Sequence, residues 1–212
     1  MSRRFAALAL ALAALGGVLI GVVAHQLRGA GSDGRGSGAA QVRGAAVWPA
    51  GLREAPEFSL PDQAGRRFAL GSLRGRPVIL AFMDSQCHQE CPLEGRALAA
   101  AFRMVPADER PVVVAVSVNP WADTPGSARR AIKRFGLSSF EWRWLLGSRA
   151  KLAPVWRKYG IEVRQTKGDI EHTDAIYLID ASGYERAGMV YPFLPTWVAN
   201  DLEVLAGEES SS

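Results

Sequence analysis

Both cysteines of the chain, Cys87 and Cys91, lie four positions apart in the segment DSQCHQECP, residues 84–92. Pro92 follows directly, and proline is well tolerated in the first turn of a helix. Cys91 is therefore expected near a helix N-terminus, where backbone N–H groups and the positive end of the helix dipole stabilise a thiolate. Cys87 belongs to the loop just before that helix. The spacing predicts two reactive thiols that act together.

Four uses of such a pair have to be compared. A structural disulfide across so short a loop contributes only about 2 kcal/mol, against about 4–5 kcal/mol for a loop of about 100 residues. Thiol–disulfide exchange normally has two residues between the cysteines, and three stand here. Peroxide reduction needs a Thr or Ser and a Pro at positions that Asp84 and Leu80 occupy. Metal binding is the fourth use.

A metal ion held by two thiolates needs at least one further ligand, and His172 is the candidate. Two thiolates and one imidazole form a soft, three-coordinate set that suits Cu(I), and Cu(II) when a water or carboxylate oxygen is added. A closed structural zinc site uses four protein ligands, so zinc would have to recruit a carboxylate or water here. His88 stands between the cysteines and is expected to point into solvent. Asp84 and Glu90 could offer an oxygen, but as loop charges they are expected to be solvated.

The segments that must position these residues alternate between strand and helix patterns. Short apolar runs and alternating residues predict strands at 58–60, 67–70, 77–82, 111–118, 175–179 and 186–191. Helical periodicity and capping residues predict helices at 93–104, 125–136, 148–159 and 194–205. The first two strands flank a turn and are expected to form a hairpin.

Strand–helix alternation implies parallel pairing through right-handed crossovers, while the short turn before the last strand requires an antiparallel pair. The predicted fold class is α/β and thioredoxin-like, with a central mixed sheet flanked by helices and an N-terminal hairpin. The cysteine loop follows strand 77–82 and so lies at its carboxyl end, where ligand sites of such sheets occur. Strand 175–179 runs the opposite way and starts at that end. His172 is therefore expected over the cysteine loop.

The two ends of the chain differ from this domain in composition. Residues 5–24 carry no charge and follow Arg3 and Arg4, and about 20 apolar residues suffice to cross a bilayer. We expect residues 1–24 to be a transmembrane anchor or signal segment, with a cytoplasmic N-terminus and an extracytoplasmic domain in the periplasm or at the cell exterior. Residues 25–47 read as a flexible linker, 48–207 as the domain and 208–212 as a polar tail.

The charge distribution excludes one class of function. The net charge is +4, and the arginines are scattered without a long basic run. Proteins that bind nucleic acid concentrate basic residues on one face or along one helix. We therefore expect no nucleic-acid partner.

Several motifs together resemble the Sco/SenC family of copper-binding, thioredoxin-like assembly factors for cytochrome c oxidase. The similarity covers nearly all of residues 58–205. It includes the opening FSLPDQAGRRFALGSLRGRPVILAF, the C-x-x-x-C-P motif as CHQECP, the segment SVNPWADTP and the histidine signature HTDAIYLIDASG. The first motif alone is weakly specific, whereas its combination with the distal histidine signature is strongly specific.

The resemblance implies that Cys87, Cys91 and His172 are copper ligands, for Cu(I) or Cu(II). It implies a metallochaperone rather than an enzyme, which delivers copper to the binuclear centre of cytochrome c oxidase subunit II or to another extracytoplasmic copper acceptor. The alternatives are a thiol–disulfide oxidoreductase, kept active by a thiol reductant, that reduces the cysteines of such a partner, and a redox-sensing domain. One position departs from the family pattern, because Asn119 replaces the usual aspartate before Pro120.

Overall fold

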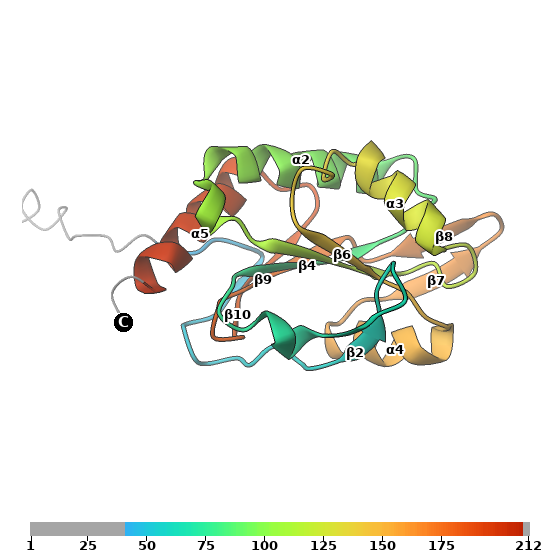
Figure 1. The fold of residues 1–212 in the computed structure, drawn as a ribbon, viewed down its shortest axis with the longest axis horizontal. Helices are drawn as coiled ribbons and strands as arrows, with labels where there is room; N and C mark the ends of the chain where they lie inside the picture. Colours follow the sequence, from blue (N-terminus) through green and yellow to red (C-terminus); the bar gives the residue numbers. More distant parts are fainter. Residues whose placement is uncertain (1–40, 210–212) are drawn as a thin grey trace, which may run out of the picture. The chain divides into compact units, whose positions relative to one another are not determined.

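The computed structural model describes residues 41–209, and its centre is a six-stranded mixed sheet (Figure 1). The order across the sheet is β1, β10, β9, β4, β5, β6. These strands are β1 (Ala46–Val47), β4 (Val78–Met83), β5 (Val112–Ser117), β6 (Trp142–Leu145), β9 (Ala175–Ile179) and β10 (Glu185–Val190). β4, β5 and β6 run parallel, while β9 is antiparallel to both β4 and β10. The predicted mixed sheet and its strand directions are confirmed.

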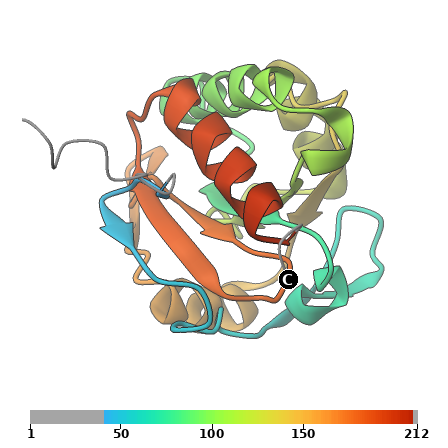
Figure 2. The ribbon, with the colours of Figure 1, turned by 90° about the vertical axis from the view of Figure 1, so that its left-hand side faces the viewer.

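Two layers cover the sheet (Figure 1). One face carries α2 (Glu90–Met104), α3 (Pro125–Arg134) and α5 (Pro195–Glu209). Figure 2 shows α5 beside α2 on this face. The other face carries α4 (Arg149–Lys158) and the hairpin of β2 (Ser59–Pro61) and β3 (Arg67–Ala69). Two short 3-10 helices, Leu70–Leu73 and Ala107–Glu109, directly precede β4 and β5.

The sequence of β4 shows why the sheet needs both layers. Ile79, Ala81 and Met83 pack with α2, α3 and α5, whereas Val78, Leu80 and Phe82 pack with α4 and the β2–β3 hairpin. Successive side chains of a strand point to opposite faces. A strand buried on both faces therefore reads as a continuous apolar run, and all six residues are at most 2% exposed.

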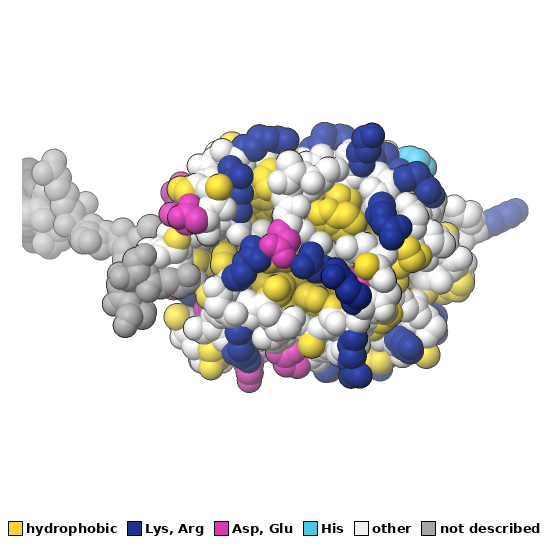
Figure 3. Space-filling view, in the orientation of Figure 1, with side chains coloured by type: hydrophobic (Ala, Val, Ile, Leu, Met, Phe, Trp, Pro, Cys, Tyr) yellow, Lys and Arg dark blue, Asp and Glu magenta, His cyan; other side chains and the backbone are white. Residues whose placement is uncertain are grey.

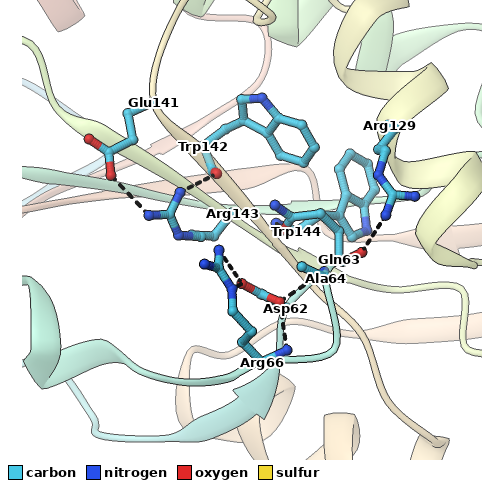
Figure 4. Close-up of polar contacts among 9 residues, drawn as sticks. All are labelled: Asp62, Gln63, Ala64, Arg66, Arg129, Glu141, Trp142, Arg143 and Trp144. Carbon is cyan, nitrogen blue, oxygen red and sulfur yellow. Dashed lines mark hydrogen bonds and ion pairs between the residues drawn. The ribbon is translucent and has the colours of Figure 1, made fainter.

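The edge strand β6 is protected by the turn of the β2–β3 hairpin (Figure 4). The backbone N–H of Trp144 donates to Oε1 of Gln63 at 2.8 Å, and Arg129 donates to the Gln63 carbonyl at 3.1 Å. Asp62 holds the turn itself by accepting from the backbone N–H groups of Ala64 and Arg66. An edge strand with unpaired backbone groups invites association, and this contact occupies one of those groups on β6.

Basic side chains are spread over the face of the molecule that Figure 3 shows. Arg76 and Arg143 share one carboxylate, that of Glu141, at 2.6 and 3.1 Å. Two positive charges against one negative charge leave an excess of positive charge at this point beside β6.

The start of α3 shows how local sequence sets an element boundary. Thr124 Oγ1 accepts from the backbone N–H of Ser127 at 3.1 Å, and Ser127 Oγ accepts from the backbone N–H of Thr124 at 2.8 Å. Pro125 occupies the first helical position. Gly136 follows the helix with φ +78°, a conformation that glycine adopts without steric cost. The predicted start and end of this helix are thus confirmed within two residues.

Three strand features were missing from the sequence interpretation. β6 went unrecognised because only four residues of a tryptophan-rich segment form it. A second hairpin, β7 (Val163–Thr166) and β8 (Asp169–His172), is short and largely polar, which left no alternating apolar pattern. Ala46 and Val47 form β1 against β10, although the linker was predicted to reach residue 47. Exposed two-residue strands carry no hydrophobic signal.

The remaining boundary predictions concern the chain ends. α5 continues to Glu209, two residues into the predicted tail 208–212. The predicted anchor or signal segment, residues 1–24, lies outside the described residues. Among residues 41–209, no helix is both long enough and apolar enough to cross a membrane.

Candidate metal centre

Cys87 and Cys91 lie where β4 ends and α2 begins. Cys91 is the second residue of α2 and is fully buried, while Cys87 in the preceding loop is half-buried. Both are free thiols, and the backbone N–H of Cys91 donates to Cys87 Sγ at 3.3 Å. The expected position at a helix N-terminus is confirmed. Cys91 itself does not face solvent, because it belongs to the apolar layer under α2.

The surroundings of the two thiols shift their pKa values in opposite directions. A hydrogen bond from the Cys91 side chain, helped by backbone N–H groups of Cys91, Gln89 and Glu90, lowers the pKa of Cys87 to about 6. Donating that hydrogen bond, together with burial, raises the pKa of Cys91. At neutral pH Cys87 is therefore the thiolate and Cys91 holds the shared proton. This is the arrangement of a nucleophile supported by a buried partner.

Asp123 anchors the cysteine loop to the sheet. Its carboxylate accepts from the backbone N–H of Ser85 at 3.0 Å, and from the hydroxyls of Ser85 at 2.5 Å and Ser117 at 2.6 Å. Burial raises the pKa of Asp123 to about 6, although the hydroxyl hydrogen bonds oppose this. The loop is thus held to β5 as well as to β4.

Asn119 holds the same loop at a second point. Its side-chain Nδ2 donates to Asp84 Oδ1 at 3.0 Å, and Asp84 Oδ1 also accepts from the backbone N–H of Gln86 at 2.7 Å. Asp84 is only 3% exposed. An aspartate at position 119 would place a second carboxylate against the first. The asparagine that departs from the family pattern therefore has a local reason.

His172 lies on the opposite side of the site from the cysteine loop. It is the last residue of β8, its side chain is 6% exposed, and its Nε2 lies 4.0 Å from Cys91 Sγ. Nδ1 lies 3.1 Å from the carbonyl oxygen of Thr173, which can only accept, so Nδ1 carries a proton. Nε2 then faces Cys91 and is the nitrogen that can take a metal ion. The structure brings Cys91 and His172 together across 81 residues.

Asp174 belongs to the same cluster, and the sequence interpretation did not identify it. Its Oδ1 lies 3.2 Å from His172 Nε2, and ligand atoms of Cys91, His172 and Asp174 all lie within 4.8 Å of one another. Its place two residues after His172 was the available signal. Of the two acids considered, Glu90 is exposed at the start of α2, as expected. The expectation that Asp84 is solvated is wrong, because Asp84 is 3% exposed and bonded to Asn119.

Glu94 is a second unexpected acid, one helical turn after Cys91. It is 1% exposed, and neither carboxylate oxygen has a hydrogen-bond partner among the described residues. Burial, and then the negative charges of Asp174 and Cys87, raise the pKa of Glu94 well above its usual value. The neutral carboxylic acid is therefore the favoured form beneath the cluster.

A cleft of about 400 Å³ opens the cluster to solvent between the cysteine loop and the β7–β8 hairpin. Cys87, His172 and Asp174 line it, whereas Cys91 lies behind them. His88 is exposed and lines the same cleft. A partner protein can thus reach Cys87 without unfolding the domain.

The sheet order and flanking helices define a thioredoxin-like α/β protein with paired cysteines at a helix start. The sequence profile of the SCO1/SenC family matches residues 49–205, and the chain belongs to this family.

Three relatives illustrate the range of the family. The chain is 30% identical over 145 residues to the mitochondrial SCO2 homologue of Bos taurus, covering 62% of this chain and 53% of that protein. It is 32% identical over 127 residues to the mitochondrial SCO1 homologue 1 of Arabidopsis thaliana, covering 59% and 36%. The aligned parts therefore span about half or less of these relatives. The structure of Bradyrhizobium japonicum ScoI with copper bound superposes with a TM-score of 0.59 at 27% identity, covering 72% of this chain and 99% of that one.

Proposed function

We propose that Cys87, Cys91 and His172 bind one copper ion, which the protein passes to an extracytoplasmic copper enzyme. The observation that carries the proposal is the 4.0 Å approach of His172 Nε2 to Cys91 Sγ, two residues far apart in the chain. Membership of the SCO1/SenC family and the copper-bound B. japonicum ScoI support the choice of metal. The proposed acceptor is the binuclear copper centre of cytochrome c oxidase subunit II.

The donor atoms fit copper chemically. Two sulfurs and one imidazole nitrogen are the soft ligands that Cu(I) prefers. Cys87 already favours the thiolate, and Nε2 of His172 is the ring nitrogen that faces Cys91 Sγ. Cys91 gives up its proton when the metal binds, as every thiolate ligand must.

The unequal exposure of the two cysteines suggests how copper leaves. Cys87 borders the cleft and Cys91 lies behind it. A thiolate of the acceptor that enters the cleft can replace Cys87 first, and Cys91 and His172 release the ion afterwards. Stepwise exchange keeps copper bound throughout and needs no free ion in solution.

A second function uses the same thiols. The pKa of about 6 gives Cys87 a large thiolate fraction at neutral pH. Such a thiolate can attack a disulfide of the acceptor to form a mixed disulfide, releasing one acceptor thiolate. Cys91, once deprotonated, attacks Cys87 Sγ and releases the second acceptor thiolate. The acceptor disulfide is then reduced, and Cys87 and Cys91 are oxidised to a disulfide until a thiol reductant restores them.

For location, we propose that residues 1–24 anchor the protein in a membrane or direct its export. The following linker then places the domain in the periplasm or at the cell exterior. The uncharged run after Arg3 and Arg4 supports this. An extracytoplasmic domain would meet the copper-accepting part of an oxidase on its own side of the membrane.

A Cu(I) titration of the fully reduced protein tests the proposed function. We expect one equivalent to bind tightly, and Cys87→Ser and Cys91→Ser each to abolish that binding. Insulin reduction is measured in parallel. Copper binding that survives both substitutions, alongside rapid insulin reduction by the wild-type protein, would favour the oxidoreductase function instead.

A further inference from the structure

The proposed ligand set leaves one donor of the cluster unused. Asp174 Oδ1 lies 3.2 Å from His172 Nε2, and its side chain is 19% exposed at the wall of the cleft. Its carboxylate and the ligand atoms of Cys91 and His172 lie within 4.8 Å of one another. A single ion between the sulfur and the nitrogen would therefore have this oxygen beside it.

The backbone fixes Asp174 at the junction of β8 and β9. Its carbonyl oxygen accepts from the N–H of Tyr191 at 2.8 Å, and the N–H of Thr173 donates to the Glu162 carbonyl at 3.1 Å. Asp174 and the residue before it are thus held by other parts of the chain. A donor on such a support keeps its place when a ligand binds.

Binding of a metal to His172 changes what Asp174 contacts. In the metal-free protein its carboxylate faces Nε2. A metal ion on Nε2 would use the lone pair that this nitrogen presents to the cluster, because the ring proton is on Nδ1. The Asp174 carboxylate would then lie next to a cation.

The oxygen of a carboxylate favours one oxidation state of copper. Oxygen is a hard donor that suits Cu(II) better than Cu(I), and its negative charge stabilises the ion of higher charge more strongly. We propose that Asp174 is the oxygen ligand that joins Cys87, Cys91 and His172 when copper is Cu(II). The residue thereby makes this protein a stronger binder of Cu(II), relative to Cu(I), than three ligands alone would be. The inference depends on the proposed copper site.

The test compares affinities for the two oxidation states in the full chain under anaerobic conditions. Asp174→Asn keeps the size of the side chain and removes its charge. We expect it to weaken Cu(II) binding at least tenfold relative to Cu(I), which raises the reduction potential of the bound copper by about 59 mV per tenfold change. The electron paramagnetic resonance spectrum of bound Cu(II) should change as well.

Two further variants serve as controls. Asp169→Asn removes an exposed carboxylate from the same cleft and should leave both affinities and the spectrum unchanged. Asp174→Glu retains a carboxylate and should restore part of the Cu(II) preference. It also provides a readout if the asparagine variant fails to fold.

Each contrary result has a distinct meaning. An equal loss of Cu(I) and Cu(II) affinity in Asp174→Asn would overturn the inference, because the residue would then act only by orienting His172. An unchanged ratio and spectrum would overturn it too, and would leave the three-ligand copper site standing. If the wild-type protein binds no copper in either state, the proposed function itself fails.

Discussion

The cysteines reach the metal centre from a loop anchored in the core, whereas His172 reaches it from a hairpin outside the main sheet. Asp84 and Ser85 of the loop are 3% and 2% exposed and bond Asn119 and Asp123. The β7–β8 hairpin is a separate two-stranded sheet in which every residue is exposed or only partly buried.

This difference indicates that the cysteine loop and the β7–β8 hairpin have different roles in binding the ion. Regions with little buried surface open at lower free-energy cost than regions tied into the core. The cysteine loop therefore fixes the position of the sulfurs, and the β7–β8 hairpin can adjust to bring His172 onto an ion. Substitutions that loosen the cysteine loop should lower the stability of the protein, and substitutions in the hairpin should lower it little.

The largest loss of stability is expected from Asp123→Asn. The amide places an NH2 group where the carboxylate accepts from Ser85 and Ser117, and each buried donor left unpaired costs about 1–3 kcal/mol. We expect a loss of about 3 kcal/mol in the free energy of unfolding, measured by urea denaturation. Asp108→Asn, at an exposed turn, is the matched control. Equal stability of the two variants would show that Asp123 does not anchor the loop.

Glu94→Gln should act in the opposite direction and with a pH dependence. Folded Glu94 keeps a proton that the unfolded chain releases above the ordinary glutamate pKa of about 4.3. Wild-type stability therefore falls, relative to the variant, by about 1.4 kcal/mol per pH unit above that value until the raised pKa is reached. Urea unfolding at pH 5, 6 and 7 measures the difference. Parallel pH profiles would mean that Glu94 is ionised in the folded protein.

A smaller loss is expected from Asn119→Asp, which restores the residue usual in the family. The hydrogen bond to Asp84 is replaced by repulsion between two carboxylates. We expect a destabilisation of about 1–2 kcal/mol at pH 8 that shrinks at pH 4, where protonation relieves the repulsion. Thermal unfolding at the two pH values checks this. A variant as stable as the wild type at pH 8 would leave the asparagine without a structural explanation.

The smallest effect on stability is expected in the β7–β8 hairpin, from Arg164→Ala. Arg164 pairs with Glu171 across β7 and β8, and both side chains are more than half exposed. Exposed ion pairs contribute about 0–1 kcal/mol, so neither global stability nor copper affinity should change measurably. A large loss of copper affinity in this variant would show that the hairpin is as rigid a support as the cysteine loop.

The same contrast separates what the sequence could predict from what it could not. CHQECP carries its own local signals, namely a buried strand before it and a proline at the helix start, so the loop could be placed directly. His172 needed the strand directions as well. The short turn after residue 179 predicted only that β9 and β10 are antiparallel, and the antiparallel pairing of β4 with β9 followed from the thioredoxin-like arrangement. The hairpin that carries His172 is so polar that no alternating apolar pattern predicts its strands.

The acids of the site were harder to assign than its ligands. Whether a carboxylate is solvated, hydrogen-bonded or buried without a partner depends on side chains from other elements. Asp84 is held by Asn119, Asp174 faces His172, and Glu94 lies unpaired under α2. None of these contacts leaves a periodic pattern in the sequence. The residue types were visible, but their environments required the fold.

The central claim is that His172 completes the copper site, rather than His88, which is nearer to the cysteines in the sequence. Cu(I) affinity is measured by competition with a chromogenic chelator for the reduced wild type, His172→Ala and His88→Ala. We expect His172→Ala to lose more than the roughly 10–100-fold that removal of an outer-shell partner costs. His88 is exposed, so His88→Ala should bind like the wild type. The reverse order of the two variants, or equal affinity in all three proteins, would contradict the account.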